Sequence, residues 1–183
     1  MTSELKSESY TRLNLSPEDA KAYFEKKLSS NAGVELVQLV DALVDACEEH
    51  VDVIPTYKSS GGNVIFYYFH KKEGWKTKEK FNLLQINTSG QLKDTQFLQF
   101  QCNRNGVANK AVWVNHWNGL GRISGHGLIV EDPSDTDKGR HTFKTEGGDL
   151  LCFANVLGND SEYVVEVAAH LAETASNIKK ALS

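Results

Sequence analysis

NVIFYYFHKK, residues 63–72, is the stretch that decides the fold class. β-Branched and aromatic residues dominate it, and this composition is typical of an extended strand. In such a strand Phe66 and Tyr68 lie on one face, and Tyr67 and Phe69 lie on the other. Aromatic side chains on both faces indicate that both sides are covered, so we predict a central position in a β-sheet.

Further β-type segments surround this strand, and turn sequences such as NTSG, NRNG and DPSDTDKG separate them. No helical periodicity interrupts the series. It predicts about eight strands, at residues 53–58, 63–72, 80–87, 95–103, 110–117, 122–130, 140–146 and 149–156. Consecutive strands joined by short turns favour a mostly antiparallel β-meander, folded as a curled sheet or a sandwich.

Helical patterns flank this meander on both sides. SPED, residues 16–19, is typical of a helix N-terminus, because serine caps, proline suits the first turn and the acid completes a capping box. It predicts a first helix that ends near residue 29, and the apolar stripe of residues 34–50 predicts a second. Apolar residues at three- and four-residue steps over residues 164–182 predict an amphipathic C-terminal helix.

The predicted fold class is therefore α+β, with two N-terminal helices, a β-meander and one C-terminal amphipathic helix. The chain has 183 residues, 40% of them hydrophobic and 24% charged, which fits one soluble domain. We assign this single domain to residues 15–183. Nothing apolar recurs in residues 1–14, which predicts a flexible arm there.

Composition also narrows the partners and the compartment. The net charge is −4, and two glutamates interrupt the densest basic cluster, KKEGWKTKEK at 71–80, so we predict no nucleic-acid partner. The sequence has neither an apolar run as long as a transmembrane segment nor the apolar region of a signal peptide. Cys47, Cys102 and Cys152 lie in apolar surroundings without a C-x-x-C motif, which predicts free buried thiols and a cytoplasmic protein.

AVWVNHWNGLGRISGHGLIV, residues 111–130, is the candidate ligand site. A turn at residues 118–121 makes it a β-hairpin, and strand alternation places six aromatic and polar side chains on one face. These are Trp113, Asn115, Trp117, Arg122, Ser124 and His126. Indole rings stack on sugars, aromatic rings or quaternary cations, and the polar groups would fix the ligand's orientation. The alternative is that both tryptophans pack into the core and the arginine covers one of them.

Metal and catalytic sites have weaker support. The acidic stretch EDPSDTDKG, residues 131–139, lacks the spacing of an EF-hand. Strand alternation does not force Asp132, His126 and His141 onto one face. We therefore predict no metal and no cofactor. No nucleophile elbow is present, so the sequence assigns no catalytic residue.

The sequence favours a non-catalytic recognition domain that binds a small polar or aromatic ligand, a sugar or a headgroup on the hairpin face. Two alternatives stay open. A small-molecule enzyme would use His126 as acid or base, with Arg122 holding an anion. An interaction or assembly protein would use an exposed helix or sheet edge instead. The oligomeric state and the identity of the ligand have no signal in the sequence.

Overall fold

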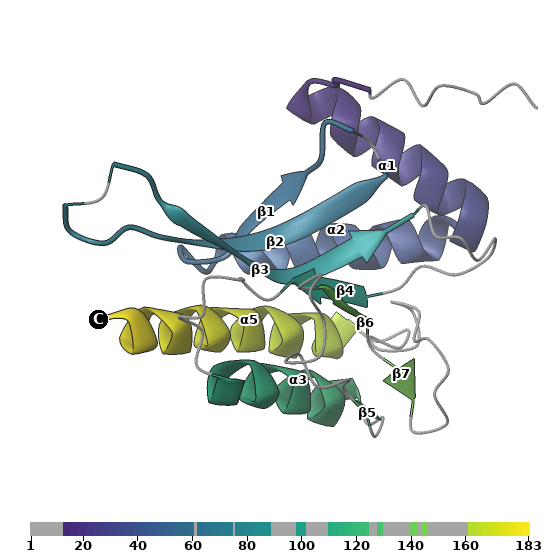
Figure 1. The fold of residues 1–183 in the computed structure, drawn as a ribbon. Helices are drawn as coiled ribbons and strands as arrows, with labels where there is room; N and C mark the ends of the chain where they lie inside the picture. Colours follow the sequence, from purple (N-terminus) through teal and green to yellow (C-terminus); the bar gives the residue numbers. More distant parts are fainter. Residues whose placement is uncertain are drawn as a thin grey trace, which may run out of the picture.

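The structure is a computed structural model. It describes residues 13–60, 62–74, 76–88, 98–101, 110–124, 128–129, 140–142, 144–145 and 161–183. These residues form four helices and several antiparallel strands, which confirms the α+β class (Figure 1). Most of the predicted N-terminal arm, residues 1–12, lies outside the described residues.

Two helices come first, as predicted: α1 (Pro17–Ala32) and α2 (Val34–Glu48). Ser16 caps α1, because its Oγ accepts a hydrogen bond from the backbone N–H of Asp19 at 3.2 Å. Gly33 separates the two helices with a φ of 94°, a conformation that residues with a Cβ rarely adopt. The boundary that the sequence predicted between the two helices therefore lies at Gly33, a few residues after the predicted end of the first helix.

The strands form one larger sheet and one short pair. The larger sheet has the order β1 (Ile54–Tyr57), β2 (Asn63–His70), β3 (Glu79–Asn87), β4 (Leu98–Gln101) and β6 (Arg140–Thr142). All neighbours in it are antiparallel, and the short pair joins β5 (Leu128–Ile129) to β7 (Lys144–Thr145). β2 is hydrogen-bonded on both sides, as its aromatic composition predicted.

The prediction of about eight strands is not supported. Three strands, β1 to β3, form the antiparallel sheet that carries the core, and the other described strands are only two to four residues long. The predicted strand at 149–156 lies outside the described residues. Residues 110–117 and the beginning of 122–130 belong to a helix instead.

That helix, α3 (Lys110–Ser124), lies where the sequence predicted two strands joined by a turn. Val112, Val114 and His116 alternate as they would in a strand, and two glycines lower the helix propensity of the stretch. The same letters also fit a helical period, because Trp113, His116 and Leu120 are buried at steps of three and four residues. Tertiary packing decided between the two patterns.

Helices α2 and α5 (Ser161–Leu182) cover one face of the sheet, and α3 lies alongside α5 (Figure 1). Alternation along β2 sends Phe66 and Tyr68 into the core beneath these helices. Ile65 and Tyr67 lie on the opposite face, outside that core cluster, although both are buried. Among the described helices, none is long and apolar enough to cross a membrane.

A β-bulge interrupts β3 at the centre of the sheet. Tyr67 pairs with Asn82, but the preceding residue of β2, Phe66, pairs with Leu84, so Leu83 is the extra residue. A bulge of this kind leaves one residue outside the ladder and changes the direction of the side chains around it. His116 lies on the helix side of the sheet at this bulge, and Asn82 and Tyr67 lie on the opposite side.

Candidate functional site

The first region lies on the helix side of the bulge. The carbonyl oxygen of Leu83 is 2.8 Å from Nε2 of His116, which α3 places beneath the sheet. A buried carbonyl outside the ladder needs a donor, so Nε2 of this histidine carries the proton. Nδ1 then accepts a hydrogen bond from the Thr174 hydroxyl of α5 at 2.7 Å. Both ring nitrogens are satisfied, and together the two partners fix the neutral tautomer.

His116 is fully enclosed, and this determines its charge. Burial, and then the neighbouring His170, lower the pKa of His116 from 6.5 to about 3, while the hydrogen bond to Leu83 opposes the shift. The indole of Trp113 meets the same imidazole edge-on, with ring centroids 5.9 Å apart. At neutral pH the imidazole is therefore an uncharged part of the core.

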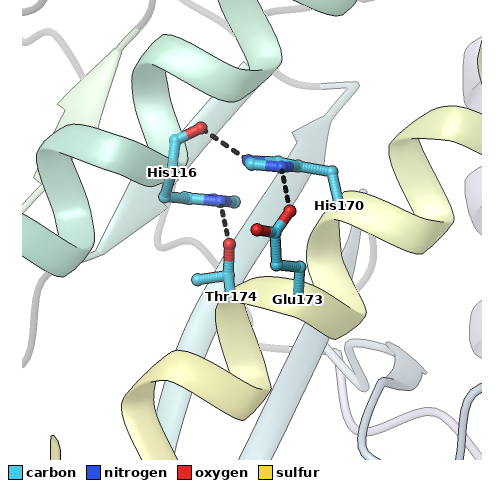
Figure 2. Close-up of polar contacts among 4 residues, drawn as sticks. All are labelled: His116, His170, Glu173 and Thr174. Atoms are coloured by element: carbon cyan, nitrogen blue, oxygen red, sulfur yellow. Dashed lines mark hydrogen bonds and ion pairs between the residues drawn. The ribbon is translucent and has the colours of Figure 1, made fainter.

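A second histidine joins α3 to α5 above it (Figure 2). The rings of His116 and His170 stack, with centroids 5.2 Å apart and planes 5° from parallel. Nε2 of His170 donates to the backbone carbonyl of His116 at 2.8 Å, and Nδ1 lies 3.6 Å from a Glu173 carboxylate oxygen. Gly119 of α3 makes room, because a Cβ there would collide with the His170 ring. We call His116, His170, Glu173 and Thr174 the histidine junction.

The histidine junction has little to offer for acid–base catalysis. Its hydrogen bonds end on two backbone carbonyls, of Leu83 and His116, and a backbone carbonyl does not take up a proton in this pH range. Nδ1 of His116 accepts from Thr174, and Nδ1 of His170 faces the Glu173 carboxylate at 3.6 Å. The junction therefore ties three elements together, and its histidines are read best as structural.

Other reactive groups give the same result within the described residues. No group of three or more His, Cys, Asp and Glu side chains is placed there to hold a metal ion. Cys47 is a free buried thiol, as predicted, and burial raises its pKa to about 12. Cys102 and Cys152 lie outside the described residues.

The structure does not bring the six predicted ligand residues together on a hairpin face. Trp113 is 2% exposed in the core, while Asn115 and Arg122 are exposed. The reason is geometric: residues two positions apart share a face in a strand but point away from each other in a helix. Trp117 and Ser124 lie within α3, although their side chains are outside the description, and His126 lies outside the described residues.

The second region lies on the opposite side of the bulge, around Tyr67. Nζ of Lys58, just after β1, lies 5.3 Å from the centroid of the Tyr67 ring, and Nζ of Lys80, on β3, lies 4.7 Å from it. The Phe69 ring is 5.6 Å from the same tyrosine. Asn82 pairs directly with Tyr67 across the ladder and so shares its face. We call Tyr67, Phe69, Lys58, Lys80 and Asn82 the Tyr67 face.

Two polar features of the Tyr67 face are uncompensated. Lys58 and Lys80 form no ion pair with any acidic residue of the described chain, whereas Lys21 lies 3.5 Å from both Glu25 and Asp41. A cation over a tyrosine ring is stabilised by the ring quadrupole, but it keeps its full charge. Two ammonium groups beside one ring therefore make the face electropositive.

The second uncompensated feature is the side chain of Asn82. It is only 6% exposed, and its Nδ2 donates to Oε1 of Gln85 at 3.1 Å. Its Oδ1 is buried and, in the part of the chain that the structure describes, accepts no hydrogen bond. An unsatisfied buried acceptor costs roughly 1–3 kcal/mol. Such a group in a native structure calls for an explanation.

Sequence reasoning missed this face, although one signal was available. KFNLLQIN, residues 80–87, has an asparagine between apolar residues in a predicted strand. A polar residue at a core position is informative by itself. No protein-family model, curated protein or solved structure matches this chain, so its function must be argued from its own residues.

Proposed function

We propose that this protein is a non-catalytic recognition domain that binds a small polar anion on the Tyr67 face. One observation carries the proposal: the ammonium groups of Lys58 and Lys80 lie over one aromatic ring and form no ion pair with an acidic residue of the described chain. The proposal keeps the non-catalytic recognition role that the sequence favoured, narrows the ligand to an anion, and moves the site from the predicted hairpin to the sheet.

The charges support an anionic ligand. The two ammonium groups lie 5.3 and 4.7 Å from one ring centroid, so they are no more than about 10 Å apart. Like charges at this separation repel each other, and a bound phosphate or carboxylate would relieve the repulsion through charge-assisted hydrogen bonds. Lys80 is exposed and Lys58 is half-buried, so solvent reaches the pair. The ring beneath them limits how far the lysine side chains spread.

The make-up of the face supports binding without catalysis. Tyr67, Phe69, Lys58, Lys80 and Asn82 include no histidine, cysteine or carboxylate that would transfer a proton near pH 7. The histidine junction lies on the other side of the sheet, and its ring nitrogens are engaged. A ligand on the Tyr67 face would therefore be held and released unchanged.

Titration calorimetry with inorganic phosphate and glucose 6-phosphate tests the proposal, with glucose as the uncharged comparison. We expect both phosphates to bind and glucose to bind much more weakly. Lys58→Gln and Lys80→Gln should each raise the Kd by about tenfold, because each removes one charge while keeping most of the side-chain length. Vesicles with and without a phosphoinositide then distinguish a lipid headgroup from a soluble phosphate.

Lys27→Gln is the matched control. Nζ of Lys27 lies 4.9 Å from the Tyr23 ring on α1, so this variant also removes an ammonium group from a tyrosine face. Its Kd should equal that of the wild type. Equal losses in all three variants would reduce the effect to net charge, and the proposal would fail. It would also fail if the wild type bound neither phosphate.

A further inference from the structure

We propose that Asn82 reads a hydroxyl group of the ligand, so that the ligand is a hydroxylated anion such as a sugar phosphate or a polyol phosphate. The inference rests on the proposed function, because the anion is held by the lysines of the same face. It adds a specificity residue and narrows the ligand class.

The orientation of the Asn82 amide is the first step. In the structure Nδ2 donates to Oε1 of Gln85, three residues along the strand, and Oδ1 is the other amide atom. Oδ1 is thus an acceptor without a donor in the described chain. A group that supplies an O–H or N–H would satisfy it.

The position of Asn82 is the second step. It stands directly opposite Tyr67, whose ring both lysines approach, and it lies two residues from Lys80 on the same strand. The bulge at Leu83 falls immediately after it, and bulges often re-aim a side chain next to a binding site. A ligand whose anionic group meets the lysines therefore has its remaining atoms near Asn82.

The charge of the neighbours is the third step. An ammonium group would also donate to Oδ1, but Lys58 and Lys80 would repel it. A neutral hydroxyl group avoids this repulsion. The combination of two cations and one neutral acceptor thus selects a ligand with an anion and a hydroxyl group, and it disfavours both bare anions and cationic amines.

Energetics supply the last step. On the other side of the same bulge, the Leu83 carbonyl receives a donor from His116 at 2.8 Å. At this place one polar group is therefore satisfied, and the other is buried without a donor among the described residues. A site built to hydrogen-bond a ligand hydroxyl discriminates strongly against an analogue without one, because its own polar group then stays unpaired.

Calorimetry with sulfate, which carries no O–H group at neutral pH, and glucose 6-phosphate on the wild type and Asn82→Leu tests the inference. Leucine has nearly the same size and no acceptor. We expect the wild type to prefer glucose 6-phosphate by about tenfold or more, which corresponds to one satisfied hydrogen bond. In Asn82→Leu the Kd for sulfate should stay within about twofold, and the preference for the sugar phosphate should disappear.

Asn82→Asp provides a rescue variant and keeps the test decisive. Its carboxylate weakens the binding of both anions, but it retains an acceptor, so the preference ratio should stay above that of Asn82→Leu. Far-UV circular dichroism checks that each variant is folded. If Asn82→Leu keeps the full preference, the inference is overturned while the proposed anion site stands. If the wild type binds neither phosphate, the proposed function fails and the inference fails with it.

Discussion

The two sides of the β3 bulge treat their polar groups in opposite ways. Toward the helices, the Leu83 carbonyl accepts a hydrogen bond from a fully buried histidine, and that histidine accepts one from Thr174. Toward the other face, the amide oxygen of Asn82 has no donor in the described chain, and the two nearby lysines have no acidic partner there. The satisfied side stabilises the fold, and the uncompensated side is where a ligand would gain most.

Residue type alone would suggest the histidine junction, and not the Tyr67 face, as the functional site. Two histidines and a tryptophan lie close together there, as in many reactive sites. The hydrogen bonds of His116, however, connect α3 to β3 and to α5. Lysines over a tyrosine ring are common on protein surfaces. Here the ring belongs to Tyr67, which pairs with Asn82, and the buried amide oxygen of Asn82 has no donor in the described chain. Whether the buried polar groups have hydrogen-bond partners therefore separates a structural region from a candidate binding region better than residue type does.

Removal of the imidazole should have the largest effect on stability. His116→Leu deprives both the Leu83 carbonyl and the Thr174 hydroxyl of a partner in the core. We expect a loss of roughly 2–5 kcal/mol in the free energy of unfolding, measured by urea denaturation. His116→Gln keeps a donor for the carbonyl and should recover part of this loss. A loss below about 1 kcal/mol in His116→Leu would contradict the structural role.

The contact between α3 and α5 should be the next most sensitive place. Gly119→Ala introduces a Cβ that collides with the His170 ring, and overpacking of this kind costs roughly 1–3 kcal/mol. The double variant Gly119→Ala/His170→Ala removes the obstructing ring. It should therefore be less destabilised than the sum of the two single variants, and strict additivity in this double-mutant cycle would show that the collision is absent.

The pH dependence of stability should distinguish His116 from exposed histidines. Its pKa is lowered to about 3 in the folded state against 6.5 otherwise, so the unfolded chain binds the extra proton first. The contribution of this neutral histidine is full above pH 6.5 and declines as the pH falls toward 3, with a slope of up to about 1.4 kcal/mol per pH unit. Urea unfolding between pH 7 and pH 4 should show a shallower decline for His116→Gln than for the wild type. Parallel curves would argue against a buried neutral imidazole.

The smallest change in stability is expected on the uncompensated side. Asn82→Leu removes a buried oxygen that has no donor in the described chain, and it also removes the Nδ2 hydrogen bond to the half-buried Gln85. These two effects oppose each other, so the free energy of unfolding should change by no more than about 1 kcal/mol. The same urea measurement as for His116→Leu gives a direct comparison of the two sides. A loss of more than about 2 kcal/mol would mean that Asn82 is needed for the fold, and its proposed role in recognition would lose its support.

The sequence predicted the parts of the fold that depend on local chemistry. Ser16 with Asp19 marked the beginning of α1, and the regular apolar stripe marked α5, because caps and helical periods are written in neighbouring residues. The aromatic run of β2 likewise identified a strand with partners on both sides. These elements need no knowledge of distant contacts.

The sequence could not predict α3 or the bulge for the opposite reason. Valine alternation favoured strands at 110–117 and 122–130, and the glycines favoured a turn between them. Only the packing of α3 through Trp113, His116 and Leu120 selects the helix. The bulge depends on register between two strands, which residue letters do not specify. The candidate site moved from α3 to the Tyr67 face because both of these non-local features were needed to locate it.

A nitrogen-15 chemical-shift titration of the wild type with glucose 6-phosphate tests the central claim most directly. The account predicts that the shifted amide signals cluster at Lys58, Tyr67, Lys80 and Asn82, while those of His116 and His170 stay in place. Saturating shifts at the histidine junction, with none on the Tyr67 face, would contradict it and would return the search for function to α3 and α5.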